Sequence, residues 1–279
     1  SKEQSDYIPN LSNAAKEADI VFGVGFMMAD ALYKVAPQFP DTYFLGIDID
    51  PIENMPNNVA TYLFKEQEGA FLVGYVVAAM TKTNMVGFVG GIPIPPVERF
   101  RYGYEAGIRV YEELHGKTIS MLQGYTMDFN DPKKGKDLAL AQFAEGADIV
   151  FHASGACGNG VIEAAAEKGQ GFFAVGVDVD QDYMAPGRVL TSSVKRVDMA
   201  SYQAVMSIAL GTFEPGTKTL GIKDEGVGIS PMKYTKDVVG PAILGEVEFL
   251  KEQIKAGNVV VPDTQEKLDA FVVPAITLP

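Results

Sequence analysis

Two stretches of this chain occur twice, at nearly the same spacing. The residues ADIVF at 18–22 are identical to those at 147–151, and YFLGIDID at 43–50 returns as FAVGVDVD at 173–180. The first aspartate of the short stretch precedes the first aspartate of the long one by 29 residues in one copy and by 30 in the other. A repeat held at matching spacing indicates two halves with a similar fold.

Short apolar strands alternate with helical patterns along the chain. Strands are expected at 19–24, 42–47, 58–64, 85–91, 117–122, 148–151 and 172–177, and helices at 28–39, 96–114, 160–168 and from Asp131, an N-cap before Pro132. The apolar run at 71–80 has half of the roughly 20 residues needed to span a bilayer, so it is expected to be a buried helix. This alternation predicts α/β lobes with doubly wound parallel sheets and right-handed crossovers.

The two copies differ in what precedes them. In the second copy ADIVF is the third strand of its sheet, whereas in the first copy only one helix comes before it. About 44 residues, one strand-helix-strand unit, are therefore expected to be missing from an N-terminally shortened first lobe. The alternative is a natural lobe with a three-stranded sheet.

Composition excludes several classes of protein. With 279 residues and 47% hydrophobic content, the chain can fill two cores, and its formal charge of −13 argues against a nucleic acid partner. Its one cysteine cannot form an internal disulfide. We find no metal-ligand pair, nucleophile elbow, phosphate loop or dinucleotide fingerprint, so no catalytic residue, metal or cofactor is predicted.

Candidate ligand-binding residues follow the repeated strands, because ligands of open parallel sheets bind beyond the carboxyl ends of the strands. Asp178 is the first choice, since a carboxylate there can accept two hydrogen bonds from a vicinal diol, as in a sugar; the alternative is a turn cap. Gly155 and Gly158 either let the backbone approach a ligand or only make a tight turn. Asp180 and Asp182 are expected to stabilise the turn, and His152 to hydrogen-bond a loop rather than face the ligand.

Several ordered blocks of the sequence resemble the basic membrane protein family of substrate-binding lipoproteins, which are receptors of ABC importers, and particularly its purine-nucleoside receptors. These blocks are FKEQEGAFLVGYVVAAM, VGFVGG followed by VERFRYGYEAG, DPKKGKDLALAQFAEGADIVFHASG, GVDVDQ and LTSSVKR. The resemblance covers roughly residues 6–230.

The resemblance implies a type I periplasmic-binding fold, with two lobes joined by a hinge and closing on a nucleoside such as adenosine, guanosine or inosine. The lobes are expected at 1–66 with 195–238 and at 67–194 with 239–279. An ABC permease is the implied partner, and the implied location is outside the cytoplasm, with the membrane reached only through a lipid anchor on a cysteine that is absent from this chain.

The resemblance also implies roles for single residues. Glu68, Asp178 and Lys195 are expected to hold the ribose hydroxyls by charge-assisted hydrogen bonds. For Glu68 the alternative is a helix-dipole partner, and for Lys195 a solvated surface cation. Phe26 either stacks on the purine or is a core aromatic.

Two other classes of function remain open at this point. A sugar or signal-molecule receptor, or a cytoplasmic ligand-sensing regulator, would have the same fold. An enzyme on a Rossmann-like scaffold would need a cofactor fingerprint that the sequence does not contain.

Overall fold

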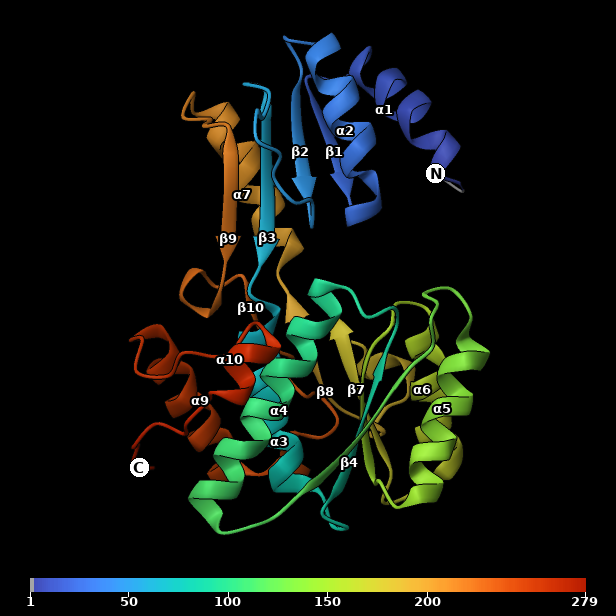
Figure 1. The fold of residues 1–279 in the computed structure, drawn as a ribbon, viewed down its shortest axis with the longest axis vertical. Coiled ribbons are helices and arrows are strands. Elements are labelled where there is room, and N and C mark those ends of the chain that lie inside the picture. Colours follow the sequence, from blue (N-terminus) through green and yellow to red (C-terminus); the bar gives the residue numbers. More distant parts are fainter. Residues whose placement is uncertain (1–2) are drawn as a thin grey trace. The chain divides into compact units, whose positions relative to one another are not determined.

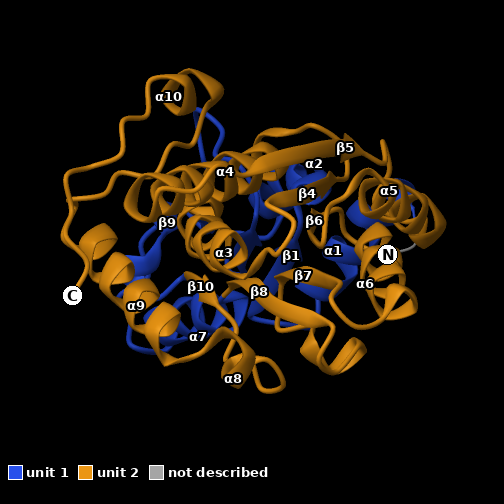
Figure 2. Cartoon of the chain, turned by 90° about the horizontal axis from the view of Figure 1, so that it is seen from below, with its two compact units in different colours: residues 1–64, 196–226 blue, residues 65–195, 227–279 orange. Residues whose placement is uncertain are grey.

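The computed structural model describes residues 3–279, which form two compact units (Figures 1 and 2). Unit 1 contains residues up to 64 and residues 196–226; unit 2 contains residues 65–195 and 227–279. The chain passes from one unit to the other three times, near residues 65, 195 and 226.

Unit 1 is a four-stranded parallel sheet with strand order β1-β2-β3-β9, within the described residues. Its strands are β1 (Ile20–Val24), β2 (Tyr43–Ile47), β3 (Val59–Phe64) and β9 (Gly216–Leu220). Its helices are α1 (Tyr7–Ala15), α2 (Ala29–Val35) and α7 (Val197–Ala209), with 3-10 turns η1 (Gln4–Asp6), η2 (Phe26–Met28), η3 (Ala36–Gln38) and η5 (Ile222–Asp224). Leu11 of α1 and Leu32 of α2 pack with Val21 and Phe44 of the sheet, so α1 and α2 cover one sheet face (Figure 1).

Unit 2 contains a six-stranded sheet with strand order β10-β8-β7-β6-β4-β5. Its strands are β4 (Met85–Gly90), β5 (Ser120–Tyr125), β6 (Ile149–Ala153), β7 (Phe173–Asp178), β8 (Val189–Lys195) and β10 (Val227–Ile229). Its helices are α3 (Glu66–Met80), α4 (Pro95–His115), α5 (Pro132–Glu145), α6 (Cys157–Lys168), α8 (Lys236–Val239), α9 (Pro241–Lys255) and α10 (Gln265–Asp269), with the 3-10 turn η4 (Asp182–Met184). All of these strands run parallel to their neighbours except β10, which is antiparallel to β8.

Most expected elements of unit 2 are found, with local differences. The apolar run 71–80 lies in α3 and is buried up to Ala78, and Asp131 caps α5 by accepting a hydrogen bond from the Lys133 amide at 3.0 Å. The strand expected at 117–122 is instead β5, three residues later. Every residue of this edge strand is exposed or only partly buried, so its apolar residues did not indicate its position.

The unit boundaries differ most at 227–238, a segment that we expected in the first lobe. It belongs to unit 2, because Gly228 pairs with Val194 of β8 and the Thr235 hydroxyl donates to the Leu190 carbonyl at 2.6 Å. These contacts join sequence positions about 40 residues apart and leave no local signal in the sequence.

Helices α3 and α4 cross at unusually close range. A Cβ atom added at Gly74, Gly103 or Gly107 would lie 2.0–2.1 Å from a backbone oxygen of the opposite helix. The absence of these side chains lets the backbones approach closely. This crossing brings the first turn of α3 against the first turns of α4, where the candidate site lies.

Candidate functional site

Asp178 ends β7 with an unusual backbone conformation. Its φ is 64°, in the left-handed region, and Asp48, its counterpart in the repeat, has a φ of 56°. A non-glycine residue rarely adopts this conformation, and such residues cluster at ligand-binding sites. The repeated phrase of the sequence therefore encodes a repeated turn, with an aspartate at the same strained position in each unit.

Asp178 is paired with Lys195, the last residue of the neighbouring strand β8. The Lys195 ammonium lies 3.4 Å from Oδ1 of Asp178. That oxygen is buried and the contact lacks hydrogen-bond geometry, while the Asp178 side chain as a whole is 49% exposed. The two residues meet because parallel strands end at the same sheet edge.

Glu68 lies in the first turn of α3, close in sequence to the crossover between the units. Its side chain is mostly buried, and its carboxylate is 3.3 Å from the Lys65 ammonium. A carboxylate in the first turn also interacts favourably with the helix dipole. Its predicted role toward a ligand stays a prediction.

Sequence analysis gave no role to Glu66 or Arg99, a charged pair of which Glu66 lies beside Lys195. Glu66, the first residue of α3, accepts hydrogen bonds from Arg99 of α4 at 2.6 Å and 3.4 Å and lies 4.0 Å from the Lys195 ammonium. The only feature of the sequence that could have pointed to Glu66 is its position, two residues before the candidate Glu68. Its partner Arg99 is 33 residues away, and only the helix crossing brings the two together.

The glycines after β6 have different roles from one another. Gly155 has a φ of 57° and makes the turn, whereas Gly158 lies inside α6, where an added Cβ would be 2.0 Å from the His152 ring. The helix begins at Cys157, earlier than the expected residue 160, so Gly158 is not a loop residue. Its packing against His152 accounts for the glycine, and its contact with a ligand stays a prediction.

Phe129 is another residue that sequence analysis did not select. An added Cβ at Gly91 would be 2.2 Å from its ring, and its carbonyl accepts a hydrogen bond from the Ala156 amide at 2.8 Å. The half-buried ring therefore lies beside the carboxyl ends of β4 and β6. It escaped notice because the surrounding segment MDFND has no strand or helix pattern.

His152 supports the turn that carries Asp178. It is fully buried, and its Nε2 lies 3.0 Å from Oε1 of Gln181, which also accepts a hydrogen bond from the Val177 amide at 2.9 Å. The backbone amide of Gln181 in turn donates to the Ser192 hydroxyl at 3.1 Å. The expected loop contact of His152 is thus confirmed, as is the turn role of Asp180, which accepts from the Asp182 amide at 3.2 Å.

The His152 imidazole is kept neutral by its surroundings. Burial lowers the pKa of His152 to about 4, although the hydrogen bond with Gln181 acts in the opposite direction. Because Gln181 Oε1 is an acceptor, Nε2 carries the proton, and Nδ1 has no hydrogen-bond partner within residues 3–279. A second proton would thus place a charge and an unpaired donor in the core.

Phe26 lies in unit 1, in the 3-10 turn η2 after β1. Its side chain is 41% exposed, so it is not a core aromatic. Its stacking on a base stays a prediction.

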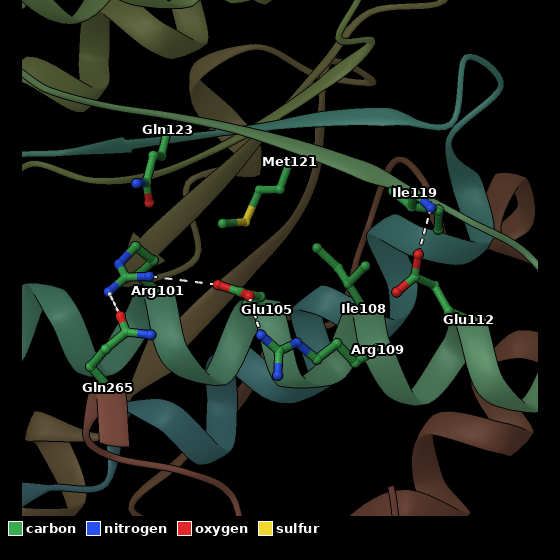
Figure 3. Close-up of a pocket in the computed structure, with 9 residues that line it drawn as sticks. All are labelled: Arg101, Glu105, Ile108, Arg109, Glu112, Ile119, Met121, Gln123 and Gln265. Carbon is green, nitrogen blue, oxygen red and sulfur yellow. Dashed lines mark hydrogen bonds and ion pairs between the residues drawn. The ribbon is translucent and has the colours of Figure 1, made fainter. Parts of the chain in front are cut away.

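A separate pocket of about 450 Å³ lies between α4 and β5 (Figure 3). Its charged groups already have partners: Arg101 contacts Glu105 and Gln265, Arg109 contacts Glu105, and Glu112 accepts from the Ile119 amide. None of the predicted ligand-binding residues lines it.

Residues 1–265 match the Bmp family, described as ABC transporter substrate-binding protein PnrA-like. The chain belongs to this family. It is 33% identical over 282 residues to a CD4+ T-cell-stimulating antigen of Listeria monocytogenes, covering 94% of this chain and 76% of that protein. It is 32% identical over 276 residues to basic membrane protein B of Borreliella burgdorferi, covering 96% of this chain and 76% of that one.

A solved structure supports the same assignment. An ABC transporter system solute-binding protein from Aeropyrum pernix K1 superimposes with a TM-score of 0.80 at 29% identity, over 97% of this chain and 85% of that chain. The type I periplasmic-binding fold and the family resemblance are therefore confirmed.

This Bmp-family chain is a substrate-binding protein of an ABC transporter, and its family is not one of enzymes. A small-molecule ligand and an ABC permease are the partners that this class implies, and its members work outside the cytoplasm. Within residues 3–279, no helix combines the length and apolar character needed to cross a membrane.

Proposed function

We propose that this chain captures a purine nucleoside for import, with Asp178 and Lys195 holding the two ribose hydroxyls. The observation that carries this proposal is the pairing of these two residues at the carboxyl ends of β7 and β8. The sequence resemblance to purine-nucleoside receptors supports the choice of ligand.

The chemistry of the pair suits a vicinal diol. Each hydroxyl can donate one hydrogen bond and accept another, so a diol can donate to the Asp178 carboxylate and accept from the Lys195 ammonium. The Asp178 side chain is 49% exposed although its Oδ1 is buried, so a ligand can reach the other part of the carboxylate. Bonds of this kind to charged groups are about twice as strong as those between neutral groups. Glu68 is proposed as a further acceptor.

Isothermal titration calorimetry with adenosine, guanosine and inosine tests the proposal. We expect the wild-type chain to bind at least one of them, and Asp178→Asn to bind it about tenfold to a hundredfold more weakly, because one charged hydrogen bond contributes about 1.5–3 kcal/mol. Asparagine tolerates the left-handed backbone of Asp178, so this substitution removes the charge without breaking the turn.

Asp180→Asn is the matched control, because it changes a carboxylate two residues away that accepts a hydrogen bond within the turn. We expect it to bind like the wild type. Deoxyadenosine, which lacks one hydroxyl of the diol, should bind about tenfold more weakly than adenosine. Binding of free ribose but of no nucleoside would instead support a sugar receptor, and equal affinities of Asp178→Asn and the wild type would contradict the proposed site.

Delivery to a nucleoside permease and lipid anchoring, both implied by the sequence resemblance, belong to the same proposal.

A further inference from the structure

Glu66 and Arg99 form a buried ion pair immediately behind Lys195. The Glu66 side chain is 1% exposed and that of Arg99 is 22% exposed. Arg99 donates to Glu66 through Nε at 2.6 Å and through Nη2 at 3.4 Å, so both carboxylate oxygens are engaged. Such a two-point contact fixes the carboxylate in one orientation.

Lys195 lies between two carboxylates. Its ammonium is 4.0 Å from Glu66 on one side and 3.4 Å from Asp178 on the other, and it lies over the Phe100 ring at 5.9 Å from the ring centroid. The Lys195 side chain is only 8% exposed. Arg99, Glu66, Lys195 and Asp178 thus form a chain of alternating charges.

Glu66 supplies a negative charge next to both Arg99 and Lys195. The alternating chain supplies two cations and two anions, and the neighbouring pair of Lys65 and Glu68 adds one of each. Loss of the Glu66 charge would make this site more positive by one charge and would remove the carboxylate that Arg99 and Lys195 share. Two neighbouring cations in a poorly hydrated position attract phosphate strongly.

We infer that the Glu66–Arg99 pair determines specificity, because Glu66 offsets the positive charge of Lys195 and thereby favours an uncharged nucleoside over a nucleoside phosphate. This inference rests on the proposed function. Glu66 acts through Lys195 by reducing the attraction of its ammonium for an anion, and Arg99 limits the negative charge that Glu66 alone would add.

The test compares the affinities for adenosine and adenosine monophosphate by calorimetry in wild type, Glu66→Gln, Arg99→Gln and the double variant. Glu66→Gln keeps an oxygen acceptor for Arg99 and should lower the adenosine preference about tenfold or more, because the site becomes more positive by one charge. Arg99→Gln leaves Glu66 without its guanidinium and should shift the preference in the opposite direction. The double variant has the same net charge as the wild type and should return to near the wild-type ratio.

The opposite signs distinguish electrostatic specificity from a structural role, since loss of packing would weaken both ligands in both variants. Glu98→Gln is the matched control, because Glu98 belongs to another glutamate–arginine pair on α4, with Arg101. It should leave the ratio unchanged, and circular dichroism verifies the fold of each variant. Failure of the wild type to bind any nucleoside would overturn the proposed function, whereas nucleoside binding with the same ratio in Glu66→Gln and Arg99→Gln would overturn this inference alone.

Discussion

Replacing Gly107 by alanine is expected to lower the free energy of unfolding of unit 2 by about 2–3 kcal/mol. The new Cβ would lie 2.0 Å from the Phe71 carbonyl oxygen and 3.0 Å from the Tyr75 nitrogen. These are backbone atoms of α3, so relief requires moving one helix away from the other. Alanine stabilises a helix by up to about 1 kcal/mol relative to glycine, which is too little to offset this clash.

Urea denaturation followed by circular dichroism measures the effect, and Gly245→Ala provides the matched control. Gly245 lies within α9, and an added Cβ there meets nothing within 4 Å. The same substitution should therefore stabilise the protein by about 0.5–1 kcal/mol at this position. If the two variants shift the unfolding midpoint in the same direction, the close α3–α4 crossing does not explain why residue 107 is a glycine.

Stability should fall steeply in mild acid because of His152. Its folded-state pKa is about 4, whereas an unfolded histidine titrates near its ordinary value of 6.5. The unfolded chain therefore binds the proton first, so the stabilisation is complete above pH 6.5 and is lost as the pH falls from about 6.5 to about 4. A difference of this size corresponds to about 3 kcal/mol, so about 2 kcal/mol is lost by about pH 5.

The measurement is the free energy of unfolding between neutral pH and pH 5 for the wild type and for His152→Gln. Glutamine keeps an N–H donor but does not titrate, so its curve should be flatter by up to about 1.4 kcal/mol for each pH unit. Carboxylates contribute equally to both proteins, and the difference between the curves isolates His152. Parallel curves would show that His152 does not cause the acid sensitivity.

Protonation of His152 at low pH should also weaken ligand binding, because His152 contacts the loop that follows Asp178. Gln181 joins the His152 ring to the Val177 amide and to Ser192. Protonation of His152 would disturb the same turn that orients the proposed diol acceptor. Sequence analysis anticipated the loop contact of this histidine but not the network that it completes.

The local sequence determined a large part of the fold. Strand and helix positions follow from the periodicity of apolar residues, and Asp131 with Pro132 marks a helix start from chemistry within three residues. The repeat indicated two halves with a similar fold, and Asp48 and Asp178 both have a left-handed backbone. These properties depend on neighbours along the chain, so they are readable without coordinates.

Tertiary structure alone decided which distant residues meet. The Glu66–Arg99 pair depends on a helix crossing that three glycines permit, and the place of 227–238 in unit 2 depends on pairing with β8. Residue 158 is similarly a glycine because a larger side chain would clash with the His152 ring across the sheet–helix interface. Such contacts arise from packing between segments far apart in the chain, and no local pattern of residues records them.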